Sequence, residues 1–321
     1  MRDKLRLPRR TFTVGAAAIS LASALSVAHA SPAIGPVVVF IPFGRESTVA
    51  TAVELLRNAT AVRLGVPVDL EYPALPHPMQ KALARMAEPS GDQIRLLATD
   101  VLVHVMWDDS QLGASPPTLN ALTPVSKLTS GYSTTLFVSA TSPIRTWTDF
   151  AAAARLGMVS IGSGNPNSIH RKFLERALGV SVGDTLLPAR EAVFKATLDG
   201  KVQAGLINTL SYVAFANANP GQLIPIVTFG GERNRTVGAP TLREVSGNER
   251  LATTNSVAVF GGAGLSAATA KRLHEAFDAA ARDPVVLADA QKMHFPLVVE
   301  GPEVVSQTIE RDRAVVARSK D

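Results

Sequence analysis

The sequence predicts an α/β protein of two domains, each built on a mostly parallel sheet flanked by helices and joined by a two-strand hinge. Short apolar runs typical of buried strands alternate with helix-forming segments along most of the 321 residues. The same strand, turn and helix pattern opens residues 37–56 and again residues 158–178. The last part of the chain holds too few strands for a sheet of its own, so we expect it to pack back on the first domain.

The first pattern begins with the apolar run of residues 37–41, which predicts a buried strand, and continues into a helix. Free main-chain N–H groups and the helix dipole at such a helix start suit an anion, often a carboxylate. The alternative is an ordinary strand-to-helix turn that binds nothing. The candidate ligand residues of this turn are Pro42, Phe43, Gly44, Arg45, Ser47 and Thr48.

Residues 66–72 and 94–98 are the next strand candidates, with a helix expected over 79–87 between them. Strand, helix and strand at these lengths predict right-handed crossovers and parallel strands. The third strand ends at Thr99 and Asp100, which we expect at the carboxyl edge of the sheet, where open α/β sheets bind ligands. Residues 108–131 are polar and rich in Pro and Gly, and the crossing into the second domain is expected after them.

The second pattern has a strand at 158–161, a turn at 162–168 and an amphipathic helix at 169–178. Two turns of this kind, one in each domain, favour a shared ligand over two unrelated turns. A later strand, at 202–207, ends in two further polar residues. The candidates from this domain are Ser163, Gly164, Asn165, Asn167, Ser168, His170, Asn208 and Thr209.

Two of the candidate side chains have open alternatives. Arg45 could hold a carboxylate through both of its terminal nitrogens, or it could be a solvated loop arginine. His170 could face the ligand, or it could lie on the surface of its helix.

Residues 1–30 resemble an export signal rather than part of the fold. A basic segment containing Arg9 and Arg10, as in twin-arginine signals, precedes an uncharged run and a small-x-small pattern at 28–30. We therefore expect a periplasmic protein that begins near Ser31. Without this segment the chain has 27 basic and 26 acidic residues, so its charge gives no reason to expect a nucleic-acid partner.

Several chemistries find no support in the sequence. The chain has no cysteine, which excludes disulfides and thiolate metal sites, and its histidines lack metal-ligand spacing. No nucleophile elbow, Walker phosphate loop or zinc-protease motif is present. We therefore expect no cofactor, no metal and no catalytic residues, and we expect a monomer.

The chain resembles the periplasmic receptors of tripartite tricarboxylate transporters, the TctC or Bug family, over nearly its whole mature length. The resemblance implies a type II periplasmic-binding-protein fold with a first domain of residues 31–130 and 253–321 and a second of 131–252. It also implies closure of the domains over a small organic anion and delivery to a membrane permease. Its motifs are Ile41-Pro42-Phe43-Gly44, Leu64-Gly65-Val66-Pro67-Val68, Ile161-Gly162-Ser163-Gly164, Gly200-Lys201-Val202 before Asn208, and Ala239-Pro240-Thr241-Leu242-Arg243-Glu244.

This chain departs from the family pattern at two places that bear on the ligand. In this chain Arg45 and Glu46 follow Gly44, whereas the family usually has Pro-Gly-Gly in this loop. Glycine allows a ligand to approach the backbone closely, so side chains at these positions narrow the space for the ligand. Asn208 replaces a common aspartate that would pair with a ligand amine, so an amino-acid ligand is less favoured than a mono- or dicarboxylate. The alternatives left open are a periplasmic sensor for a signalling partner and an exported enzyme.

Overall fold

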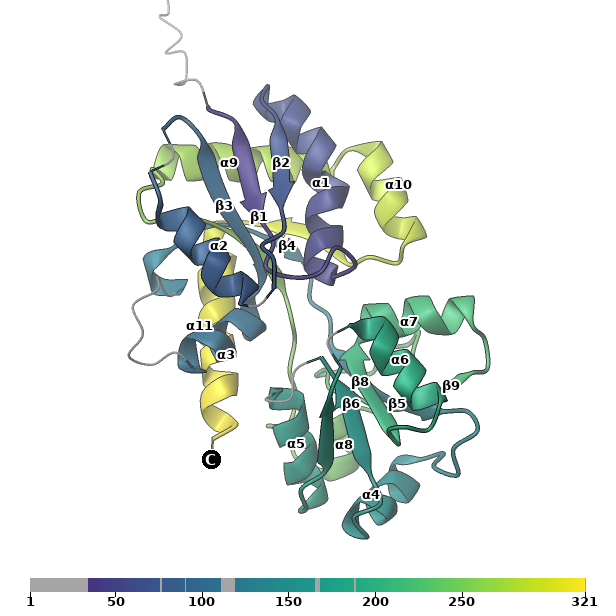
Figure 1. Cartoon of the computed structure of the whole chain (residues 1–321). Helices are drawn as coiled ribbons and strands as arrows, with labels where there is room; N and C mark the ends of the chain where they lie inside the picture. The colour runs from purple at the N-terminus through teal and green to yellow at the C-terminus, as the bar shows by residue number, and fades with distance from the viewer. Residues whose placement is uncertain are drawn as a thin grey trace, which may run out of the picture. The chain divides into compact units, whose positions relative to one another are not determined.

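The computed structural model describes residues 34–75, 77–89, 91–110, 119–164, 168–187 and 189–320 (Figure 1). The expected export signal, Asn165 and Asn167 lie outside these residues. Within the described ranges, no helix combines the length and the apolar character needed to cross a membrane.

The first sheet has six strands in the order β11-β4-β10-β3-β1-β2. Alternate residues of β1 face opposite sides, so that Val37 and Val39 join one apolar core and Val38 and Phe40 join another. Helices α1, α9 and α10 cover the first side, whereas α2, α3 and α11 cover the second (Figure 1). The strands are β1 (Val37–Phe40), β2 (Val68–Glu71), β3 (Ile94–Asp100), β4 (Thr123–Thr129), β10 (Val257–Gly261) and β11 (Leu297–Glu300). The helices are α1 (Thr48–Leu64), α2 (Pro78–Ala87), α3 (Val101–Ser110), the 3-10 helix η1 (Leu119–Ala121), α9 (Ala267–Ala281), α10 (Pro284–Lys292) and α11 (Pro302–Arg318).

The second sheet has five strands in the order β7-β6-β8-β5-β9. Phe150 of α4 and Phe173 of α5 pack on one side of it, and Phe194 of α6 and Tyr212 of α7 pack on the other. The strands are β5 (Thr134–Ser139), β6 (Ser160–Ser163), β7 (Gly183–Leu186), β8 (Ala204–Asn208) and β9 (Leu223–Thr228). The helices are α4 (Trp147–Arg155), α5 (Ile169–Leu178), α6 (Arg190–Leu198), α7 (Thr209–Ala218) and α8 (Leu242–Ser246).

The predicted α/β fold with two helix-flanked sheets is confirmed, and both sheets are mixed, with most strands running in one direction. In the first sheet β1 pairs in parallel with β2 and β3, whereas β10 and β11 join through antiparallel pairings. In the second sheet β6 pairs in parallel with β7 and β8, whereas β5 is antiparallel to β8 and β9. Strands β5 and β10, which directly follow the two connections between the sheets, are among the antiparallel ones.

Strand β4 lies inside the polar segment of residues 108–131, which its composition had not marked as a strand. Its polar side chains are buried because each has a partner in the surrounding structure. Ser126 Oγ lies 2.9 Å from His274 Nδ1, and Lys127 Nζ donates to Glu300 Oε2 at 2.6 Å. Because several of the buried side chains of β4 are polar, its sequence lacks the alternating apolar pattern of a strand. Hydrophobic periodicity therefore did not predict it.

Two segments connect the sheets, residues 130–133 and 253–256, and they run side by side. Tyr132 and Asn255 exchange two main-chain hydrogen bonds, of 3.0 and 2.7 Å. Gly131 has a φ of 120°, and a Cβ there would lie 2.6 Å from Thr254 Cγ2. Only glycine allows this approach, so the two connections are closely paired at this point.

Candidate functional site

A cavity of about 290 Å³ is lined by residues at the carboxyl ends of strands from both sheets and at the starts of four helices. The helix starts belong to α1, α3, α5 and α7. Nine of the predicted site residues line it: Phe43, Ser47, Thr48, Asp100, Ser163, Gly164, Ser168, His170 and Asn208.

The start of α1 contributes the turn that opened the first sequence pattern. Ser47 is the N-cap residue, and its Oγ accepts a hydrogen bond of 3.1 Å from the main-chain N–H of Ala50. Phe43 and Thr48 lie beside it in the cavity wall. The remaining unpaired main-chain N–H groups of the first turn of α1 lie at the cavity wall.

Asp100 ends β3 and caps α3, because its Oδ1 accepts from the main-chain N–H of Val103 at 3.1 Å. Its Oδ2 accepts from the Tyr132 hydroxyl and, at 3.0 Å, from Asn255 Nδ2. Burial raises the pKa of Asp100 although these hydrogen bonds oppose the shift. The carboxyl thus links the first sheet to both of the segments that connect the sheets.

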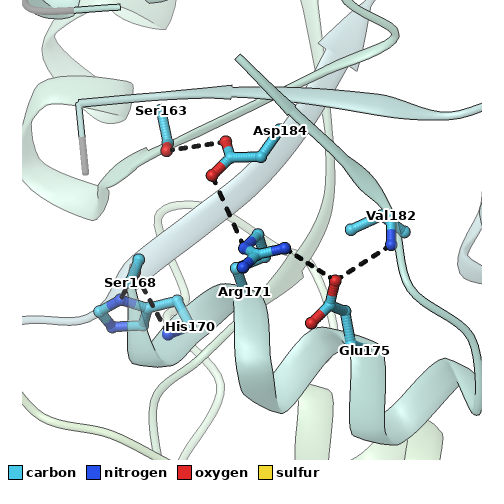
Figure 2. Close-up of polar contacts among 7 residues, drawn as sticks. All are labelled: Ser163, Ser168, His170, Arg171, Glu175, Val182 and Asp184. Carbon is cyan, nitrogen blue, oxygen red and sulfur yellow. Dashed lines mark hydrogen bonds and ion pairs between the residues drawn. The ribbon is translucent and has the colours of Figure 1, made fainter. Parts of the chain in front are cut away.

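The start of α5 brings Ser168 and His170 to the cavity (Figure 2). His170 Nδ1 lies 2.9 Å from Ser168 Oγ, and Nε2 lies 3.1 Å from Thr134 Oγ1. The ring packs edge-on against Phe229. Burial lowers the pKa of His170 to about 4, so the imidazole is neutral at pH 7.

Ser163, at the end of β6, is held by a group of charged residues behind the cavity (Figure 2). Its hydroxyl donates to Asp184 Oδ1 at 3.3 Å, and Asp184 Oδ2 lies 3.6 Å from Arg171 Nε. Arg171 also pairs with Glu175 at 2.9 Å. The guanidinium of Arg171 therefore balances two carboxylates and does not line the cavity.

Asn208 ends β8 and caps α7, with its Oδ1 accepting from the main-chain N–H of Ser211 at 2.8 Å. The amide nitrogen of its side chain keeps its two hydrogens for other partners. Asn208 thus adds the fourth helix start to the wall.

No lysine or arginine is among the described residues that line the cavity, and Asp100 is the acidic residue there. The groups here that can attract an anion are therefore main-chain N–H groups and helix dipoles rather than cationic side chains. The described residues also contain no group of three or more His, Cys, Asp or Glu side chains arranged to bind a metal.

Five predicted residues do not line the cavity. Arg45 stacks on the Tyr72 ring, with its guanidinium carbon 4.2 Å from the ring centroid, and lines a different pocket, between α1 and α10. The Thr209 hydroxyl lies within 3.0 Å of those of Ser133 and Thr135, inside the second sheet. The remaining three lie next to cavity residues in sequence: Pro42, Gly44 and Thr99.

Sequence reasoning missed Tyr132, Thr134 and Asn255, all of which line the cavity. Tyr132 and Asn255 lie in the two connections between the sheets, and Thr134 begins β5. A tyrosine directly after Gly131 and an asparagine before an apolar strand were the available signals. Hydrophobic periodicity does not detect such residues, because it gives no information about which polar side chains meet between the two connections.

Two α/β sheets joined by a paired two-strand connection, with a cavity at their helix starts, define a type II periplasmic-binding-protein fold. The model of one family, described as the tripartite tricarboxylate transporter family receptor, matches residues 86–311. The chain therefore belongs to this family, and the resemblance seen in the sequence is confirmed. A comparison with curated proteins found no match.

Solved structures of solute-binding proteins share this fold at low sequence identity. A TctC solute-binding protein from Polaromonas is 16% identical with a TM-score of 0.66, and the match covers 90% of this chain and 100% of that one. MatC from Rhodopseudomonas palustris with bound malate is 20% identical with a TM-score of 0.71, covering 88% and 99%. A second R. palustris protein, with adipate, is 16% identical with a TM-score of 0.72, covering 88% and 95%.

Proposed function

We propose that the protein is an exported receptor that binds a small organic carboxylate in the cavity and delivers it to a membrane permease. The observation that carries this proposal is the convergence of four helix starts on one cavity. Each helix start carries a partial positive charge of about half an elementary charge together with unpaired N–H groups.

The size and lining of the cavity favour a compact ligand. Its volume of about 290 Å³ is close to the lower end of the range for small-molecule sites. Phe43, Met106 and Leu206 supply apolar surface for a short carbon chain, while the helix starts supply donors for a carboxylate. The malate-bound and adipate-bound structures of related fold support a ligand of this kind.

Delivery follows from a change in shape on binding. The ligand would touch residues of α1 and α3 on one side and of α5 and α7 on the other, and so would stabilise a closed form by its differential affinity. The paired segments at Tyr132 and Asn255 are the proposed hinge. The closed surface would then be recognised by the permease of a tripartite transporter on the periplasmic side of the membrane.

The proposal predicts that purified protein is stabilised saturably by carboxylates. A thermal-shift screen of mono-, di- and tricarboxylates should reveal at least one ligand, whose stabilisation reaches about 2.7 kcal/mol at a concentration 100 times its Kd. Binding should fall below about pH 4, where carboxylic acids become protonated. A screen in which only amines or neutral sugars bind would contradict the proposal, and turnover of a bound compound would indicate an enzyme.

A charge-adding variant tests the location of the site. Asn208→Asp keeps a good helix cap but places a second carboxylate in the cavity wall, so it should weaken carboxylate binding about tenfold or more in calorimetry. Asn58→Asp makes the same change on the exposed surface of α1 and should leave the affinity unchanged. Equal affinities for both variants would place the ligand elsewhere.

A further inference from the structure

Asp100 is a carboxyl group in the cavity wall that is surrounded by hydrogen-bond donors. Its Oδ2 accepts from the Tyr132 hydroxyl and from Asn255 Nδ2. The main-chain N–H groups of Leu102 and Val103 also donate to this carboxyl. Such a set of donors suits an ionised carboxylate, which only accepts hydrogen bonds. Although burial raises the pKa of Asp100, these contacts favour a negative charge at this position.

A second buried carboxyl group, that of Asp312, lies outside the cavity on α11, which packs against α3 and β4 (Figure 1). Arg311 links it to the second connection between the sheets. The Nε of this arginine donates to Asp312 Oδ1 at 2.9 Å, and its Nη2 donates to the main-chain oxygen of Thr254 at 3.0 Å. Asp312 Oδ2 makes no hydrogen bond with any residue that the structure describes. An ionised oxygen buried without a donor is costly, and a proton on Oδ2 removes the charge.

The charges of these two carboxyl groups act on each other and on Tyr132. Burial raises the pKa of Asp312 to about 7, Arg311 opposes this rise, and Asp100 adds to it. Burial also raises the pKa of Tyr132, and the charges of Asp100 and then of Asp312 raise it further. Tyr132 lines the cavity, so the wall at this point lies within the field of both carboxyl groups.

Other charged and titratable groups lie on the elements around this pair. They are Arg313 on α11, Lys127 on β4, His104 and Asp108 on α3, Glu300 on β11 and His170 on α5. Lys127 favours the ionised form of Asp312, but it also pairs with Glu300 at 2.6 Å. Arg313 lowers the pKa of Asp108, which burial raises. Burial lowers the pKa of His104 to about 3 and that of His170 to about 4, so both rings are neutral at pH 7.

A carboxylate ligand adds a further negative charge beside Asp100. No lysine or arginine is among the described residues that line the cavity, so no cationic side chain of the wall cancels this charge. A negative charge raises the pKa of nearby acids. Asp312 already holds its proton to about pH 7, so it is the group that the added charge would protonate at neutral pH.

We propose that the protein takes up a proton when it binds its carboxylate ligand, and that Asp312 holds this proton. This inference rests on the proposed function, because it needs an anion in the cavity. The proton comes from solvent and adds to the carboxylate of Asp312. One negative charge near the cavity is therefore cancelled as the charge of the ligand arrives.

The proposal fixes the sign of the pH dependence. The pKa of Asp312 is about 7 without ligand and is higher with ligand, so affinity is greatest below about pH 7. Affinity then falls as the pH rises through the pKa of the bound form. A shift of about one pH unit corresponds to an affinity about tenfold lower at pH 9 than at pH 6.

Calorimetry in buffers of different ionisation enthalpy measures the proton directly. The probes are succinate, malate, adipate and any further acid that the thermal-shift screen finds, titrated at pH 7.5 in phosphate, HEPES and Tris. Simple carboxylic acids are ionised at this pH, so a proton that is taken up goes to the protein. We expect an uptake of about half a proton per ligand at pH 7.5 and much less at pH 9.5.

The two proposals fail in different ways. A carboxylate that binds without proton uptake, or with proton release, overturns the inference and leaves the proposed function standing. If no carboxylate binds at any pH between 6 and 9, the proposed function fails and the inference fails with it.

A neutral variant assigns the proton to its group. Asp312→Asn resembles the protonated carboxyl, so it should bind without proton uptake and with an affinity that hardly changes between pH 6 and pH 9. Asp289→Asn, at an exposed carboxyl of α10, is the matched control and should behave as the wild type does. Proton uptake that persists in a folded Asp312→Asn protein would place the proton on another group, such as His170, and would contradict the assignment.

Infrared difference spectroscopy on the wild type gives a readout that needs no variant. At pH 7.5 the ligand should add the C=O band of a protonated carboxyl group, and the band should shift in heavy water. A bound carboxylate that produces no such band contradicts the inference even if Asp312→Asn does not fold.

Discussion

At the residue scale, the carboxyl of Asp312 on α11 is a buried acidic group outside the cavity, with a side chain that is 1% exposed. Its Oδ1 accepts from Arg311 Nε at 2.9 Å, but Oδ2 makes no hydrogen bond within the described part of the chain. Burial raises the pKa of Asp312 to about 7, and nearby Asp100 adds to the rise while Arg311 and Lys127 oppose it. The ionised form is therefore disfavoured in the folded state.

This raised pKa predicts a pH-dependent contribution to stability. The folded state binds the proton more tightly than the unfolded state, whose carboxyl has an ordinary pKa near 3.8. The contribution is present below about pH 4 and is lost as the pH rises to about 7, by at most about 1.4 kcal/mol per pH unit. Asp312→Asn should remove this loss, so the variant should gain stability relative to the wild type as the pH increases.

Urea unfolding at pH 4.5, 6 and 7.5 measures the difference between the two proteins. Asp289→Asn, at an exposed carboxyl of α10, is the matched control and should show no such trend. A constant difference between Asp312→Asn and the wild type at all three pH values would contradict the assignment.

At the element scale, the contact between β5 and β8 depends on a glycine. Gly205 of β8 pairs with Phe137 of β5, and a Cβ at this position would lie 2.3 Å from Phe137 Cζ. The phenylalanine is fully buried among Phe194 and Tyr212, so it has no space to move.

Gly205→Ala should therefore destabilise the protein by about 1–3 kcal/mol, as overpacked cores do. Gly231→Ala is the control, because a Cβ there meets nothing within 4 Å. The two midpoints of urea denaturation give the comparison. A Gly205→Ala protein as stable as Gly231→Ala would mean that Phe137 can turn away.

At the scale of the whole molecule, the proposed function requires that the ligand change the distance between the sheets. The chain has no cysteine, so fluorescent probes can be attached at introduced cysteines without background. Val62 on α1 and Leu186 on β7 are 79% and 57% exposed, so they suit this use.

A saturating carboxylate should shorten the distance between probes at Val62→Cys and Leu186→Cys, because the hinge closes around the bound ligand. Probes at Val62→Cys and Val285→Cys, both on helices that cover the first sheet, should keep their distance. Binding without any change in the first pair would show that the receptor does not close, and delivery to a permease would need another signal.

The local elements were predictable because their signals lie within short stretches of sequence. Apolar runs located β1, β3 and β8, and the turns after two such runs located the starts of α1 and α5. The same signals brought Phe43, Ser47, Ser168 and Asn208 to the candidate site. The direction of a side chain could not be predicted from these local signals. Arg45 was therefore a candidate, although its guanidinium stacks on Tyr72 outside the cavity.

The sequence alone determined the alternation of strands and helices, the two turns at helix starts and the family, since each depends on residues close together in the chain. The tertiary structure alone decided that β4 is a strand, that Asp100 meets Tyr132 and Asn255, and that the hydrogen of Ser163 points at Asp184. These contacts join residues up to 155 positions apart. Their formation depends on buried polar groups finding partners across the fold, and no local pattern of hydrophobicity records those partners.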